Sequence, residues 1–214
     1  MKKSLLIIGA GEGLSLATAE KFGKEGFAVG LINRDKNKAA VILKTLAEQH
    51  IDAYSEVADA TDYISLEHAI RELTRQLGGI SVLIYNPAAL KNKDILDVEP
   101  QEFMDDFKIN VGSALKSIQL TIADLKVSSG TILLTGGGFA THPSFKNGTL
   151  SIGKAGIRNL ALQLNEKLGQ EGIYVGTLTI TAKITPDSTN HNPVKLAQAY
   201  WEMFNDRIEV EVII

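Results

Sequence analysis

Short apolar runs alternate along this chain with segments whose apolar residues recur at helical spacing. The runs are SLLIIG, FAVGLI, DAYSEV, ISVLIY, GTILLTG, IYVGTLTI and IEVEVII, and helical spacing covers about 14–24, 36–49, 63–77, a long stretch ending near 126, 150–169 and 193–204. Strands that are nearly all apolar are buried on both faces, and crossovers of helix length make neighbouring strands parallel. The pattern predicts an α/β fold with a three-layer, doubly wound parallel sheet of about seven strands.

The chain length and its longest irregular stretches indicate where a ligand would bind. With 214 residues, 44% of them apolar, the chain suffices for one domain with a large core, so we expect residues 1–214 to form a single domain. The stretches 86–98, 137–148 and 181–193 each follow a predicted strand. Ligands of open parallel sheets bind beyond the carboxyl ends of the strands. We therefore expect the substrate site at those ends, within these three loops.

The composition argues against several kinds of partner. A net charge of −3 provides no basic surface for nucleic acid. The sequence has no cysteine and its four histidines show no ligand spacing, so we expect neither a disulfide framework nor a metal site. Glycines interrupt the first apolar run after five residues, which is too short for a signal segment or a membrane span. We expect a cytoplasmic protein that binds a small molecule.

A glycine-rich loop, GAGEGLS, follows the first predicted strand and precedes a helix. Glycines at this place let the backbone turn tightly and approach a pyrophosphate, which the unpaired N–H groups of a helix N-terminus favour. The alternative is a plain strand-to-helix turn. Because a whole α/β rhythm follows, the loop favours a dinucleotide-binding Rossmann fold, with contacts from Gly9, Gly11, Glu12, Gly13 and Leu14.

The end of the second predicted strand, LINRDKNK, bears on the choice of cofactor. An acidic residue there would bind the adenosine ribose hydroxyls and repel a 2′-phosphate, whereas here Asn33 is neutral and Arg34 can pair with that phosphate. Glu12 argues the other way, because a carboxylate near the ribose repels the same phosphate. The balance favours NADP, with NAD as the alternative. A solvated loop charge is the other interpretation of Arg34.

The motifs GAGEGLS, ADATD, IYNPAA, KIN, LLTGGG and LSIGK occur in an order and spacing that resemble the short-chain dehydrogenase/reductase family across essentially the whole chain. Gly9 and Gly13 match two glycines of the family's signature, while Ile8 and Ser15 replace its threonine and its last glycine. The resemblance implies an NAD(P)-dependent oxidoreductase that forms a homo-oligomer, a dimer or tetramer. The resemblance also implies further cofactor contacts from Asp59, Ala60, Asn86, Ala88, Lys154 and Thr185. Without the resemblance, Asp59 would be interpreted as a helix cap.

Two residues depart from the catalytic pattern that this resemblance implies. In the family, a tyrosine four residues before a lysine exchanges the substrate proton, a serine polarises the carbonyl, and an asparagine holds a water. Lys154 and Asn110 remain as the implied catalytic residues, but Leu150 stands at the tyrosine position and Gly137 at the serine position. The chain therefore resembles a divergent member that lacks the usual acid.

Several groups are candidates for the missing acid. Tyr85 ends the fourth predicted strand, with core packing as the alternative, and His142 lies in a predicted site loop, with simple exposure as the alternative. Water can protonate carbon when a polarised double bond is reduced, with the backbone N–H groups of 136–138 stabilising the enolate. Two functions remain open. One is an oxidoreductase with a non-standard site for an apolar carbonyl or enone, and the other is a catalytically silent NAD(P)-binding sensor or assembly subunit.

Overall fold

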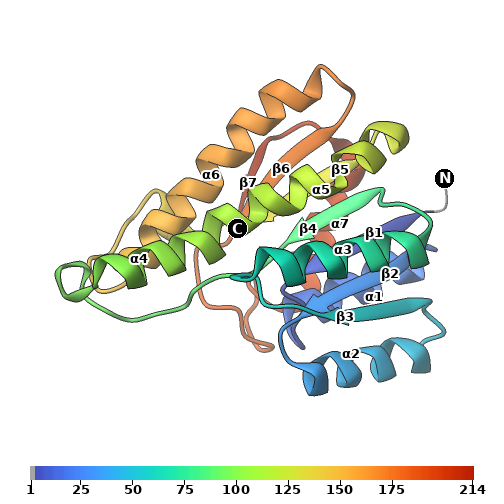
Figure 1. Ribbon diagram of the computed structural model, residues 1–214, viewed down its shortest axis with the longest axis horizontal. Helices are drawn as coiled ribbons and strands as arrows, with labels where there is room; N and C mark the ends of the chain where they lie inside the picture. The colour runs from blue at the N-terminus through green and yellow to red at the C-terminus, as the bar shows by residue number, and fades with distance from the viewer. Residues whose placement is uncertain (1–2) are drawn as a thin grey trace.

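The computed structural model describes residues 3–214 and contains one seven-stranded sheet in which every pairing is parallel (Figure 1). The strand order is β3-β2-β1-β4-β5-β6-β7. The strands are β1 (Ser4–Ile8), β2 (Ala28–Asn33), β3 (Ala53–Val57), β4 (Val82–Tyr85), β5 (Thr131–Thr135), β6 (Tyr174–Thr179) and β7 (Glu211–Ile213). This arrangement confirms the predicted doubly wound parallel sheet.

Helices cover both faces of the sheet and so make three layers (Figure 1). One face carries α1 (Leu14–Lys24), α2 (Lys36–Glu48) and α7 (Pro193–Asp206), and the other carries α3 (Tyr63–Leu77), α5 (Ser113–Ser128) and α6 (Gly148–Gly169). The short helix α4 (Pro100–Phe107) projects past the carboxyl ends of the strands, at the left of the view, where the loops also contain the 3-10 turns η1 (Ile95–Asp97) and η3 (Gly138–Ala140). No helix within 3–214 is long and apolar enough to cross a membrane.

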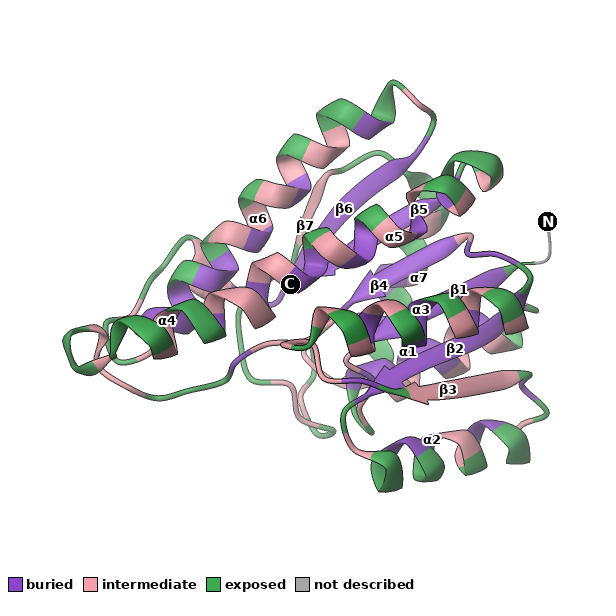
Figure 2. Ribbon diagram, viewed as in Figure 1, coloured by how far each residue is buried: buried purple, intermediate pink, exposed green. Residues whose placement is uncertain are grey.

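Burial falls from the centre of the sheet to its edges (Figure 2). Every residue of β1, β2, β4, β5 and β6 is buried, whereas β3 and β7 at the two edges are half-buried or exposed. The inner strands are apolar because helices cover both of their faces. The buried apolar side chains accordingly form one cluster on each side of the sheet.

The long helix expected to end near residue 126 is interrupted. Helix α4 ends at Phe107, a π-helical turn (η2, Lys108–Gly112) follows, and α5 continues to Ser128. The turn contains Asn110, whose side chain is buried against Gly153 of α6. Such turns inside helices occur often at functional sites. The expectation of one continuous helix was wrong because apolar spacing continues through the segment and gives no signal of the extra residue.

The strand order reverses between β1 and β4, so the loops after these two strands leave the sheet side by side. The backbone N–H of Asn86, which follows β4, donates to the carbonyl of Ile8 at 3.0 Å. In doubly wound sheets a ligand crevice forms outside the carboxyl ends at such a reversal. The glycine loop after β1 and the segment after β4 therefore meet at one place.

Candidate functional site

The loop between β1 and α1 leaves open space beside its glycines. Gly9 has φ of +78°, and a Cβ there would lie 2.7–2.8 Å from Pro87 atoms, so only glycine fits. Nothing lies within 4 Å of a Cβ built at Gly11 or Gly13. Helix α1 begins at Leu14 with no side-chain cap and no acidic residue in its first turn. This helix N-terminus therefore favours an anion.

Asn33 braces the glycine loop. Its side-chain amide donates to the carbonyl of Ala10, and its Oδ1 accepts from the backbone N–H of Asp35 at 2.8 Å. The next residue, Arg34, is exposed, and so is Glu12 in the glycine loop. The cation and the carboxylate that bear on the choice of cofactor are therefore both open to solvent.

Asp59 lies in a turn after β3. It accepts hydrogen bonds from the hydroxyl and the backbone N–H of Thr61, both at 2.7 Å, and these bonds together with the Arg34 charge lower the pKa of Asp59. The cap of helix α3 is Asp62, so the interpretation of Asp59 as that cap is wrong. The carbonyl of Ala60 accepts from a serine hydroxyl of α5.

A chain of side-chain hydrogen bonds links four elements at the switch point. The Asn86 amide donates to Ser15 Oγ at 2.9 Å, and Ser15 donates to the Gly9 carbonyl at 3.2 Å. Thr135 Oγ1 donates to Asn86 Oδ1 at 2.8 Å and lies 2.7 Å from the hydroxyl of buried Tyr200. Because Thr135 has one hydroxyl proton, Tyr200 is the donor. The sequence considered alone offered the Thr135 hydroxyl only as an acid with no evident base, and it did not reveal the contact with Tyr200, because both are polar residues within apolar patterns.

Lys154 is buried at the carboxyl end of β5. Its Nζ donates to the carbonyl of Thr135 at 2.8 Å, and its side chain is 9% exposed. Burial lowers the pKa of Lys154 to about 8. A Cβ at Gly137 would lie 3.3 Å from Lys154 Cδ and Cε, so the lysine stem packs over this glycine. Leu150, one turn earlier on α6, is also buried.

Asn110 offers an unpaired amide close to α6. Its Oδ1 accepts from the backbone N–H of Ala89 at 2.9 Å, but its Nδ2 has no hydrogen-bond partner within residues 3–214. A Cβ at Gly153 would overlap the Asn110 side chain, so glycine lets α6 approach the π-turn. A buried donor without a partner is rare in folded proteins and suits a ligand or a bound water.

The geometry weakens two of the acids considered from the sequence. Tyr85 is 1% exposed and donates its hydroxyl to the carbonyl of Ile109, and burial raises its pKa. It packs in the core, as its alternative interpretation held. His142 is exposed in the loop before α6, with Nδ1 at 3.0 Å from Thr141 Oγ1.

The glycines after β5 do not form a three-amide oxyanion site. The N–H of Gly136 donates to the Leu178 carbonyl at 2.8 Å, and that of Gly138 donates to the Ile180 carbonyl at 2.9 Å. These bonds extend the β5–β6 pairing. Among the described residues, Gly137 alone of the three glycines has an N–H with no hydrogen-bond partner. The hypothesis that all three amides stabilise an oxyanion is therefore corrected to one amide.

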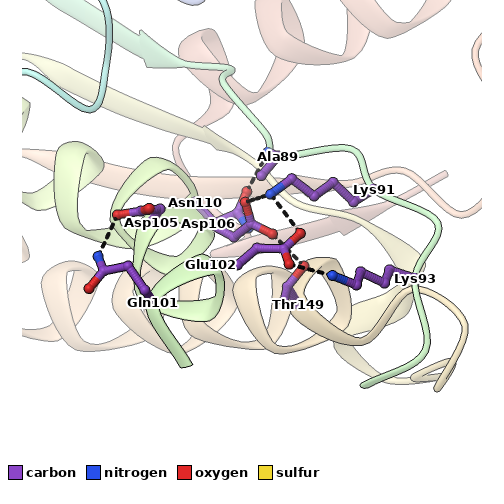
Figure 3. A network of polar contacts seen from close by, with 9 residues as sticks. All are labelled: Ala89, Lys91, Lys93, Gln101, Glu102, Asp105, Asp106, Asn110 and Thr149. Atoms are coloured by element: carbon purple, nitrogen blue, oxygen red, sulfur yellow. Dashed lines mark hydrogen bonds and ion pairs between the residues drawn. The ribbon is translucent and has the colours of Figure 1, made fainter. Parts of the chain in front are cut away.

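A polar network fixes the segment after β4 to α4 and α6 (Figure 3). The Asp106 carboxylate, 2% exposed, accepts from Thr149 Oγ1 at 2.8 Å and lies 2.7 Å from Lys91 Nζ. Lys91 also contacts Glu102 at 3.1 Å, and Lys93 contacts Glu102 at 2.6 Å. Sequence reasoning missed this network, because its members look like ordinary surface charges.

Backbone contacts join the same segment to the loop before α6. The N–H of Ile95 donates to the Phe145 carbonyl at 2.9 Å, and the side chain of Asn147 donates to the Lys91 carbonyl at 3.0 Å. The loops after β4 and β5 therefore form one lobe beyond the sheet.

Thr185 lies apart from the residues described so far. Its N–H donates to the His191 carbonyl at 3.2 Å and its carbonyl accepts from Ser188 at 3.2 Å, within the β6–α7 loop. No hydrogen bond in the described chain joins this turn to Lys154 or to the glycine loop. Ala88 is half-buried in the segment after β4.

Two cavities lie away from the carboxyl ends of the strands. One of about 250 Å³ lies among α7, β7 and the start of β6, and one of about 340 Å³ lies between α3 and α5. Neither contains a residue expected at the site from the sequence. The candidate site therefore rests on the glycine loop, the hydrogen-bond chain and the buried lysine.

The sheet order and the loop at its reversal define a Rossmann-type α/β protein. Residues 3–193 match the short chain dehydrogenase family, and the chain belongs to this family. It is 25% identical over 171 residues to the 3-oxoacyl-(acyl-carrier-protein) reductase FabG of Staphylococcus aureus, covering 75% of this chain and 70% of that protein.

Solved structures with the same fold cover almost the whole chain. A dehydrogenase/reductase from Sinorhizobium meliloti has a TM-score of 0.90 at 20% identity, covering 99% of this chain and 93% of that one. An alcohol dehydrogenase from Thermococcus sibiricus, complexed with 5-hydroxy-NADP, has a TM-score of 0.88 at 18% identity, with 99% and 95% covered. These likenesses agree with the observed sheet.

Proposed function

We propose that this oxidoreductase uses NADP(H) and acts on a small apolar carbonyl or enone at the carboxyl ends of the strands. The observation that carries the proposal is the loop after β1. Gly9 turns with positive φ, and Gly11 and Gly13 face open space at an uncapped helix N-terminus. These features suit a diphosphate, which needs close backbone approach and unpaired N–H groups.

Other described residues suit the remaining parts of a dinucleotide. The Asp59 carboxylate and Ala60 would meet the adenine, and Asn86 and Ala88 would line the ribose side. Lys154 would bind the nicotinamide ribose and Thr185 the carboxamide, while the unpaired Asn110 amide suits a water beside them. When bound, the reduced cofactor supplies a hydride. The chain's own residues must orient the substrate and supply the proton.

Arg34 supports NADP over NAD. It is exposed beside neutral Asn33, whose polar atoms are engaged by the loop backbone. The nearby acidic residue, Asp35, accepts from the backbone N–H groups of Asn37 and Lys38 as the cap of α2. Glu12 is exposed and free to turn away from a 2′-phosphate. Structures of the same fold include one in complex with NADP and one described as an NADH-dependent reductase, so the fold alone does not choose.

Leu150 and Gly137 give the proposed site its non-standard character. If they occupy the family's tyrosine and serine positions, the usual proton donor and carbonyl-polarising hydroxyl are absent. Loss of a positioned general acid lowers rates by about 100- to 10,000-fold. This loss is also the observation that favours the second candidate, a silent NAD(P)-binding sensor or assembly subunit. We further propose a homo-oligomer, as the family implies, in which a neighbouring subunit completes the site beside the short segment between β6 and α7.

Thermal unfolding with each cofactor tests the proposal. NADPH at 100 times its Kd should stabilise the protein by about 2.7 kcal/mol, with a weaker effect from NADH. Arg34→Glu should reverse this preference, because a carboxylate repels the 2′-phosphate. Absence of stabilisation by either cofactor would contradict both candidate functions. Where NADPH binds, its oxidation across ketones, quinones and enones identifies an enzyme, and silence across the panel favours the sensor.

A further inference from the structure

Among the buried ionisable side chains described at the carboxyl end of β5, Lys154 alone has no side-chain partner, since its only hydrogen bond goes to a backbone carbonyl. Tyr200 donates its hydroxyl to Thr135 and is 1% exposed. The charges of α4 and its loop pair with one another around Asp106. Arg158, one turn after Lys154 on α6, is paired with Glu211 at 2.7 Å. Among the described residues at the carboxyl end of β5, Lys154 is the only charged side chain that has no carboxylate partner.

The Lys154 ammonium has donors to spare. An ammonium carries three N–H bonds, and Lys154 uses one of them on the Thr135 carbonyl. Its Cδ and Cε lie 3.3 Å from the position that a Cβ of residue 137 would take. The unpaired N–H of Gly137 lies on the same backbone that this stem covers. The N–H of Gly137 and two N–H bonds of the Lys154 ammonium are therefore free donors at the carboxyl end of β5.

The surroundings of Lys154 suit a proton donor. Burial lowers the pKa of Lys154 to about 8, against about 10.4 for an ordinary lysine. Such a group is mostly protonated at pH 7 and is a stronger acid than an exposed lysine, as efficient general acid catalysis requires. Buried Leu150, one turn earlier on α6, adds apolar surface at this end of the helix. Gly137 leaves the room that the stem needs to reach the Thr135 carbonyl.

We propose that Lys154 is the proton donor of this site, with Gly137 providing the space for its side chain. This assignment rests on the proposed function. As the substrate carbonyl carbon accepts a hydride from the reduced dinucleotide, an N–H bond of the ammonium breaks and an O–H bond forms on the carbonyl oxygen. The neutral amine then takes a proton from water, and the dinucleotide leaves oxidised.

The pH dependence of reduction distinguishes a donor from a residue that only binds cofactor. Reduction needs the protonated lysine, so its rate should fall about tenfold per pH unit above the Lys154 pKa. Lys154→Arg keeps the positive charge but is a very weak acid. It should retain NADPH binding in thermal shift and lose on the order of 100-fold in rate. Lys167→Arg, an exposed change on the same helix, is the matched control and should alter neither.

A titration of the cofactor-free protein supplies a readout independent of turnover. Lysine side chains labelled with ¹³C and ¹⁵N are followed by NMR, and the signal missing in Lys154→Met assigns the residue. The expected midpoint lies well below 10, and Gly137→Ser should displace the stem and raise it. A midpoint near 10.4 would overturn the assignment.

Two kinetic results would also overturn it. One is Lys154→Arg turning over within threefold of the wild type with an unchanged pH profile, and the other is NADPH binding without turnover of any ketone or enone. Absence of NADPH binding would instead defeat the proposed function, and the assignment with it.

Discussion

At the scale of single residues, Gly9 is the position where backbone conformation most constrains the site. Its φ of +78° lies in the left-handed region, and the space where a side chain would start is filled by Pro87. The sequence located this glycine correctly between β1 and α1, because its place after an apolar run is a local pattern. Pro87 is far from Gly9 in the sequence, so no local sequence pattern predicts the contact between them.

Replacing Gly9 with alanine should therefore do more than strain a turn. We expect Gly9→Ala to lower the free energy of unfolding by about 2–4 kcal/mol, through positive φ and overlap with Pro87, and to abolish stabilisation by NADPH. Gly26→Ala is the control, because Gly26 has φ of +86° but nothing within 4 Å of its Cβ position. It should cost about 1 kcal/mol and leave NADPH binding intact. Equal losses in urea unfolding would contradict this account.

At the scale of secondary structure, apolar periodicity was a good guide wherever an element packs against the sheet. It found all seven strands and the six helices that cover them, since burial of those faces is a local requirement on the sequence. It failed between α4 and α5. The π-turn there depends on Asn110 meeting Gly153, a contact between two elements.

Helix α4 and the segment after β4 depend on one buried carboxylate. Asp106 is 2% exposed, and its partners are Thr149 on α6 and Lys91 on the loop. If the segment after β4 moved away with Lys91, the Asp106 carboxylate would keep only the neutral Thr149 hydroxyl as a donor. An ion pair broken on one side leaves an uncompensated charge, which is the costly case. The network therefore holds the loop closed.

Lys91→Met tests this clamp. We expect a loss of about 1–2 kcal/mol in stability, below the value for fully buried pairs because Lys91 is 43% exposed. Amide hydrogen exchange should quicken in residues 86–96. Adding Asp106→Asn should recover part of the loss, because the buried charge is then removed. Lys93→Met is the control and should cost less than about 0.5 kcal/mol, because its partner Glu102 keeps Lys91. Identical effects of both single changes would contradict the clamp.

At the scale of the whole molecule, the two faces of the sheet are coupled at the switch point. The hydrogen-bond chain runs from Tyr200 on α7 through Thr135 and Asn86 to Ser15 on α1. Lys154 on the opposite face donates to the carbonyl of the same threonine. Sequence analysis could not find this chain, because its members are separated by 49 to 71 residues and each alone resembles a core position.

Thr135→Val measures this coupling with little change of shape. The change leaves the Tyr200 hydroxyl and Asn86 Oδ1 without their partner, so we expect a loss of about 1–3 kcal/mol and weaker NADPH binding. With Tyr200→Phe added, the total loss of stability should be about 1 kcal/mol smaller than the sum of the losses of the two single variants, because one orphaned hydroxyl is removed.

Thr131→Val on the same strand is the matched control. Thr131 Oγ1 is buried without a partner within residues 3–214, so its removal should be neutral or stabilising. If both valines cost the same in urea unfolding, the threonine hydroxyl contributes nothing and the glycine loop is held by its backbone alone.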